Sequence, residues 1–148
     1  MIKPILLLSA FYSVNALSQV TVLEPLSFGT IVVVENTPSS SVTLLPSGTS
    51  SGTNIHIMRN GYPAELLFEG FGARVQINIT DSGVHQPLTR INGGTAFTLD
   101  NIIYANSIVT NAYGMATLKI GGQLSASGDG QLYLDDNYST TVEITIAY

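Results

Sequence analysis

The sequence predicts an all-β fold built from short antiparallel strands. Three observations support this prediction. Apolar and polar residues alternate in short runs, no stretch shows the period of an amphipathic helix, and Gly, Pro, Ser, Asn and Asp separate the runs. Parallel strands need long crossover connections, which this close spacing does not offer, so the strands are expected to pair antiparallel.

The first element is a leader rather than a strand. Lys3 is followed by an apolar run over residues 5–14, and Ala16 supplies the small residue that signal peptidase requires. The run is too short to cross a membrane, which needs about 20 apolar residues. We therefore predict a signal peptide over residues 1–16 and a mature domain over residues 17–148, with cleavage after Ala10 as an alternative. After cleavage no integral membrane segment is expected.

About nine strands follow. The clearest alternation is in residues 74–79 and 141–148, where Val142, Ile144, Ile146 and Tyr148 share one face of the last run. The other expected strands are residues 20–23, 27–34, 41–45, 64–68, 96–103, 116–124 and 131–134, and His56 also falls in an apolar, strand-like run. The Ser-rich stretch 38–52 is expected to form a hairpin or edge strand with a mobile tip. This pattern favours a single immunoglobulin-like β-sandwich.

Charge and cysteine content exclude several functions. The chain has 148 residues, a net charge of −5 and no Cys. A negative net charge argues against nucleic-acid binding and against a polybasic membrane patch. Without Cys there is no thiolate metal site, iron–sulfur cluster or thiol nucleophile. Export without disulfides favours a bacterial protein of the periplasm, cell surface or extracellular space.

The sequence offers little reactive chemistry. Residues 48–52 match the G-x-S-x-G pattern around Ser50, but that nucleophile motif requires a strand-to-helix turn, and no helix is predicted there. His56 and His85 have no third partner that would suggest a metal ligand set. The acidic residues near the C-terminus, which are Asp129, Asp135 and Asp136, lack the spacing of a calcium loop. We therefore expect no enzyme activity, no cofactor and no metal.

Three motifs resemble a known family when taken in order. They are residues 26–31 (LSFGTI), 118–124 (LKIGGQL) and 138–148 (YSTTVEITIAY). This order resembles the bacterial exported domains of unknown function family 4402, which is related to the spore coat protein U domains and to the pilin-like subunits of archaic chaperone–usher pili. Independently of the family, Gly29 and the Gly121–Gly122 pair are expected to permit a backbone bend, close approach or bulge.

The resemblance implies an assembly function. In pilin-like subunits a strand from the next subunit completes an incomplete sandwich, and such fimbriae serve in cell adhesion. Candidate assembly residues are Val20, Val22 and Leu23 near the mature N-terminus, and Val142, Ile144, Ile146 and Tyr148 at the C-terminus. The expected partners are further copies in a fibre or a periplasmic chaperone.

Two points of the assembly hypothesis stay open at the sequence level. Cleavage after Ala16 leaves a short N-terminal donor segment with no clean apolar face, whereas cleavage after Ala10 would lengthen it. The last run could instead complete the sandwich of its own molecule. The alternative function is a monomeric secreted module that binds a saccharide or a host-surface ligand, although the chain has no Trp to serve as a sugar platform.

Overall fold

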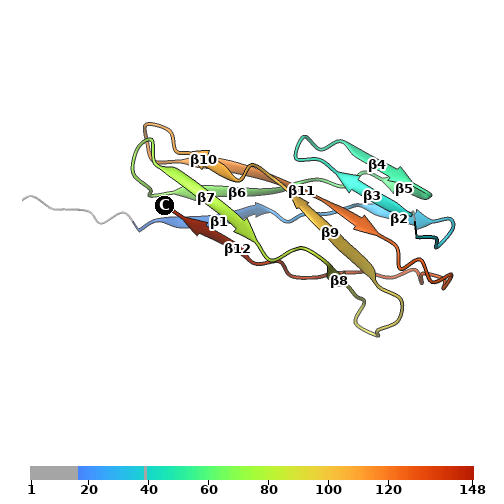
Figure 1. Ribbon diagram of the computed structural model, residues 1–148. Coiled ribbons are helices and arrows are strands. Elements are labelled where there is room, and N and C mark those ends of the chain that lie inside the picture. Colours follow the sequence, from blue (N-terminus) through green and yellow to red (C-terminus); the bar gives the residue numbers. More distant parts are fainter. Residues whose placement is uncertain (1–16, 39) are drawn as a thin grey trace, which may run out of the picture.

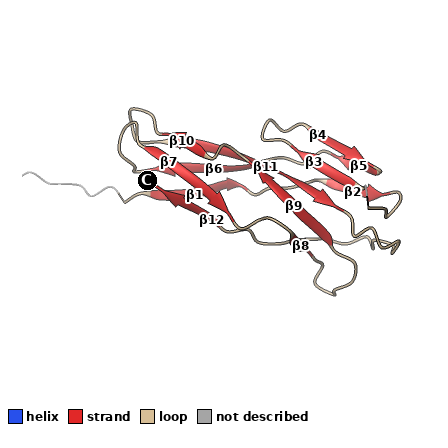
Figure 2. Ribbon diagram, viewed as in Figure 1, coloured by secondary structure: helices blue, strands red, loops and turns tan. Residues whose placement is uncertain are grey.

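The computed structural model describes residues 17–38 and 40–148, which form strands and loops arranged around one apolar core (Figure 1, Figure 2). The predicted leader, residues 1–16, lies outside the described residues. The strands are β1 (Gln19–Glu24), β2 (Thr30–Val33), β3 (Ser41–Leu44), β4 (Ser50–Thr53), β5 (Ile55–Arg59), β6 (Ala64–Glu69), β7 (Gln76–Asp81), β8 (Gln86–Leu88), β9 (Phe97–Ile103), β10 (Ser107–Val109), β11 (Ala116–Ser125) and β12 (Ile144–Ala147). All pairings between them are antiparallel.

Strand β11 is the centre of the larger sheet. Its first half pairs with β6, and its second half pairs with β3 on one side and β9 on the other. The sheet order is β1-β6-β11-β3-β4, with β8 added through β9. A second sheet has the order β10-β7-β12, and β2 and β5 form a two-stranded ribbon. These layers confirm the prediction of an all-β, antiparallel sandwich.

The core lies between the two sheets and follows the period of two that is typical of half-buried strands. Leu66 and Phe68 of β6 are buried, and so are Ile77 and Ile79 of β7, which confirms the inward face predicted for residues 74–79. Their polar neighbours along each strand face outward. These alternating side chains join the two sheets into one apolar cluster.

Residues 17–38 and 40–148 form twelve strands where the sequence predicts about nine. Strands β8 and β10 are only three residues long, and a pattern of alternation cannot be recognised over so few residues. Residues 50–53 have the composition of a loop but form β4, so the stretch 38–52 contains the predicted hairpin of β3 with β4. Pairing with β3, and not intrinsic propensity, makes this segment a strand.

One strand prediction is wrong. Residues 131–134 form no strand, because the backbone of Gln131 is engaged by side chains instead. The Gln131 N–H donates to Asp129 Oδ1 at 2.9 Å, and its carbonyl accepts a hydrogen bond from Asn36 Nδ2 at 2.8 Å. Similarly, the last predicted strand, residues 141–148, is regular only over β12.

Gly29 lies at a close crossing of two chain segments. Its φ is +79°, and a Cβ atom there would overlap the carbonyl oxygen of Arg59. A Cβ on Gly61 would in turn overlap the carbonyl oxygen of Ser27. Only glycine fits this crossing, which confirms the close approach expected at Gly29.

Candidate functional site

A groove of about 1320 Å³, lined mostly by apolar residues, lies between the first and last segments of the described chain. One wall is formed by residues 25–33 together with Val22, and the opposite wall by residues 133–142 together with Ile144. These two walls are called here the first rim and the second rim. A cavity of this size exceeds the range of about 300–1000 Å³ typical of small-molecule sites. It is therefore large enough for an extended ligand.

The floor of the groove is part of the hydrophobic core. Leu66, Leu99, Ile120 and Leu124 line it, and each is less than 10% exposed. They come from β6, β9 and β11, so the larger sheet supplies the floor. A ligand that enters the groove would therefore meet core side chains directly.

The first rim consists of strands with one unpaired edge. β1 pairs with β6 and β2 pairs with β5, and the chain between them includes Pro25, which has no N–H to donate. An isolated bridge between Ser27 and Tyr62 holds this stretch to the domain. In β1 every residue is exposed, since the strand has a partner strand only in β6.

The second rim runs along the smaller sheet. β12 pairs with β7, and further back Ser139 and Thr89 exchange two backbone hydrogen bonds of 3.0 and 3.1 Å. Val142 and Ile144 alternate inward and are half-buried, as the sequence predicted for this face. The opposite edge of β12 has no partner strand in the described sheets. The groove is thus bordered by β2 on one side and, at Ile144, by β12 on the other, and each of these strands has one partner strand in the described sheets.

The side chain of Asn36, three residues after the first rim, binds the segment that precedes the second rim. Its Nδ2 lies 2.9 Å from Ser127 Oγ, 2.7 Å from Asp129 Oδ1 and 2.8 Å from the Gln131 carbonyl oxygen. Its Oδ1 accepts a hydrogen bond of 2.8 Å from the N–H of Gly128. Hydrogen bonds from the Gln131 backbone N–H, from Ser127 and from Asn36 lower the pKa of Asp129 below its usual value. This network fixes where the second rim begins.

Aromatic side chains hold the same end of the second rim. Tyr133 stacks on Phe97 with ring centroids 4.2 Å apart, and Tyr138 meets Phe97 edge-on at 5.1 Å. The Tyr133 hydroxyl donates to the Ala96 carbonyl at 2.8 Å and accepts a hydrogen bond from the N–H of Ser127. These rings pack against each other and into the wall, so they do not present the open, flat face that a sugar ring stacks on.

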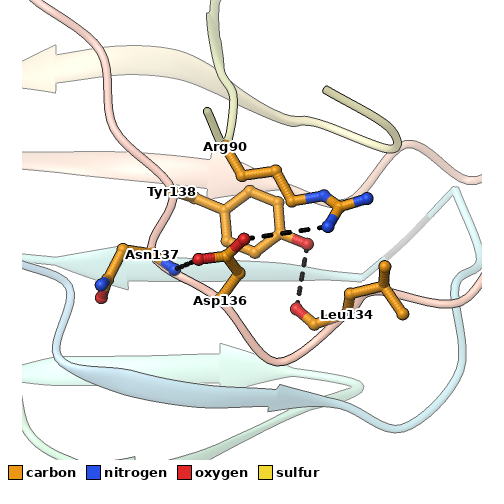
Figure 3. Close-up of polar contacts among 5 residues, drawn as sticks. All are labelled: Arg90, Leu134, Asp136, Asn137 and Tyr138. Carbon is orange, nitrogen blue, oxygen red and sulfur yellow. Dashed lines mark hydrogen bonds and ion pairs between the residues drawn. The ribbon is translucent and has the colours of Figure 1, made fainter. Parts of the chain in front are cut away.

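The second rim carries two carboxylates, those of Asp135 and Asp136. Asp136 lies 3.8 Å from Arg90 NH1, and its other oxygen accepts a hydrogen bond of 2.8 Å from the N–H of Asn137 (Figure 3). The Tyr138 hydroxyl donates to the Leu134 carbonyl and closes the intervening turn (Figure 3). Neighbouring Asp135 also lines the groove.

The structure brings three of the predicted assembly residues to the groove, namely Val22, Val142 and Ile144. The other four do not line it. Val20 and Leu23 are exposed on β1, Ile146 packs half-buried on the core, and Tyr148 contacts Phe71 edge-on with ring centroids 4.9 Å apart. The sequence did not identify residues 25–33 of the first rim as lining a groove. Pro25 was the available signal, because a residue without an N–H interrupts strand pairing.

The residues considered for catalysis or metal binding lie elsewhere. Ser50 begins the edge strand β4 instead of a strand-to-helix turn. His56 is exposed on β5, and His85 is exposed in a loop with a φ of +59°. Within residues 17–38 and 40–148, no group of three or more His, Cys, Asp or Glu side chains is placed to hold a metal ion.

No helix in the described part of the chain is long and apolar enough to span a membrane.

Comparison with known proteins gives a single result. No curated protein and no solved structure matches the chain. The sequence profile of the family described as "Domain of unknown function (DUF4402)" matches residues 18–148. The match covers nearly the whole chain, and the protein therefore belongs to the DUF4402 family.

Proposed function

We propose that this protein is an exported structural subunit, a pilin-like module of an extracellular fibre or matrix that is assembled by β-strand addition. The observation that carries the proposal is the groove between the two rims, with core side chains for its floor and β2 and β12, each with one unpaired edge, contributing to its walls. Exposed strand edges are costly for a secreted protein because they invite pairing with other chains. Here two such edges lie on either side of one groove.

An extended strand suits this groove chemically. Its backbone can exchange hydrogen bonds with a rim, and its alternate side chains can reach the apolar floor of Leu66, Leu99 and Ile120. Such a strand would link this subunit to the polypeptide that provides it, either another subunit or a periplasmic chaperone.

The proposal is tested on the protein isolated from the envelope of cells that export it. We expect a ladder of species on denaturing gels without heating, which collapses to one band after boiling, because strand-completed sandwiches dissociate slowly. A single monomer band without heating would contradict assembly and favour the alternative of a monomeric binding module. N-terminal sequencing of the same sample tests the predicted cleavage site.

A pair of variants links the ladder to the groove. Val142→Asp places a charge in the second rim, and a buried, unpaired carboxylate would oppose strand insertion. Thr145→Asp is the matched control, since Thr145 is an exposed residue of β12 that does not line the groove. We expect the ladder to disappear in the first variant and to persist in the second, with thermal unfolding confirming that both are folded.

A further inference from the structure

We infer that the strand that enters the groove carries a Lys or Arg beside Asp135 and Asp136. We also infer that this strand belongs to a different protein and not to a second copy of this chain. This inference rests on the proposed function, because it names the partner that the groove would accept. It is carried by the charges around the groove and by the distribution of cations along the chain.

The lining of the groove is apolar or neutral except at one end. Asp135 and Asp136 are its charged residues, and no Lys, Arg or His is among the residues that line it. Both carboxylates lie on the second rim, a few residues after Gln131, whose carbonyl accepts a hydrogen bond from Asn36. A strand lying in the groove therefore meets negative charge at one end and apolar side chains along the rest.

The protein neutralises this charge only in part. Arg90 pairs with Asp136 at 3.8 Å, and its side chain is 17% exposed against 36% for that of Asp136 (Figure 3). Asp135 is exposed, and no cationic side chain of the described residues lies within ion-pair distance of it. The groove thus keeps about one uncompensated negative charge, which a basic residue of the entering strand would pair with.

A second copy of this chain lacks a suitable strand. Lys119 lies in the central strand β11 and Arg59 ends β5, whereas Arg74 lies in the loop before β7 with a φ of +58°. Arg90 already pairs with Asp136, and Lys3 falls in the predicted leader. The N-terminal segment that could act as a donor, residues 11–24, contains no Lys or Arg and ends at Glu24. The net charge of −5 on each copy adds repulsion between them. A basic partner protein avoids both difficulties.

The test measures binding of synthetic peptides to the full chain by fluorescence anisotropy. The peptides have 12 residues with alternating Val and Thr, and they differ only in one terminal residue, which is Lys, Gln or Glu, placed first or last in separate peptides. We expect one of the two Lys peptides to bind about two- to fivefold more tightly than its Gln counterpart, the gain of an exposed ion pair, and the Glu peptide to bind more weakly than both.

Two variants assign the preference to the groove. Asp135→Asn is expected to abolish the advantage of the Lys peptide over the Gln peptide. Glu143→Gln is the matched control, because Glu143 is exposed on the same segment but does not line the groove. Raising the salt to 0.5 M should reduce the Lys advantage in the unaltered protein, since exposed ion pairs are screened.

The outcomes separate this inference from the proposed function. If no peptide binds, the groove does not accept a strand and the proposed function fails together with the inference. If the Gln, Lys and Glu peptides bind equally, the groove accepts strands but the inference is wrong. A peptide with the sequence of residues 11–24 that binds as tightly as the Lys peptide would also overturn it, because a second copy would then be an equal partner.

Discussion

The hydroxyl group of Tyr104 donates a hydrogen bond of 2.6 Å to Asp81 Oδ2. Asp81 is the last residue of β7, and its other oxygen accepts a hydrogen bond from the N–H of Gly83. Tyr104 directly follows β9, so this contact joins the two sheets where both strands end. The Tyr104 ring also packs against the apolar core, so this one residue fixes the ends of both strands to the core.

The Tyr104 contact predicts a loss of stability at high pH. Burial, then the hydrogen bond to Asp81 and its negative charge, raise the pKa of Tyr104 to about 12. The folded state thus holds this proton more tightly than the unfolded state, with a pKa of about 10. The stabilisation is complete below pH 10 and is lost between pH 10 and 12.

Tyr104→Phe tests this assignment. We expect the unfolding free energy of the variant to be about 1 kcal/mol lower than that of the unaltered protein at pH 7. This difference should shrink as the pH rises to 12. Urea unfolding of both proteins, with the absorbance of tyrosinate at 295 nm, measures the two effects. A constant difference between pH 7 and 12 would show that the hydrogen bond to Asp81 does not stabilise the fold.

Asp129 predicts an effect at the opposite end of the pH range. Because its pKa in the folded protein is lowered from 3.8, the carboxylate contributes stability above pH 4 and loses it as the pH falls through the folded pKa. Asp129→Asn should be less stable than the unaltered protein at pH 6, and the difference should shrink below pH 4. Urea midpoints from pH 2 to 6 measure it, and parallel curves would contradict the role of Asp129 beside Asn36.

At the scale of elements, a strand could be predicted from the sequence when it was long and when no distant residue decided its backbone hydrogen bonds. Strands β6, β7 and β11 alternate over six residues or more, and the sequence located them to within about two residues. β4 was taken for part of a mobile tip because its residues, Ser50 to Thr53, resemble a loop. Residues 131–134 were taken for a strand because nothing in the sequence shows that Asn36, almost a hundred residues earlier, binds Gln131.

The crossing between the first rim and the end of β5 yields a prediction for Gly29. Gly29→Ala combines a strained positive φ with an overlap against the Arg59 carbonyl oxygen. Gly130→Ala is the matched control, since Gly130 has a φ of +75° but no atom within 4 Å of an added Cβ. We expect a loss of about 1 kcal/mol for the control, from strain alone.

The Gly29→Ala variant should lose about 3 kcal/mol or more, because backbone atoms at the crossing must also move apart. Urea unfolding of the two variants measures the difference, and failure of Gly29→Ala to fold while Gly130→Ala folds would agree with it. Equal losses would mean that the crossing can relax without cost.

At the scale of the whole molecule, the sandwich has a buried apolar core, and part of that core is accessible through the groove. Of the residues that the structure describes, seventeen apolar ones are buried, and several of these also line the groove. The cavity therefore lies beside a folded core and does not depend on a strand from outside to create it. Filling it should add burial and backbone hydrogen bonds to a structure that already exists.

This architecture predicts that a bound strand raises the thermal stability of the entire domain. A ligand that binds only the folded state stabilises it by about 2.7 kcal/mol at 100 times its Kd. The Lys peptide described above should therefore raise Tm in proportion to the logarithm of its concentration. The Val142→Asp variant should show no such rise, and an unchanged Tm in the unaltered protein at saturating peptide would argue against binding in the groove.

The sequence alone determined the all-β fold, the antiparallel pairing and the inward face of Val142 and Ile144, because each depends on local alternation. It predicted a bend or close approach at Gly29, and the structure showed that only glycine fits there. Only the tertiary structure decided where the groove lies and which residues border it. The first and second rims are separated by about a hundred residues, and their relation depends on strand order and on contacts such as Asn36 with Gln131. Local patterns carry no information about such distant neighbours, since side chains alternate in the same way whichever strands pair.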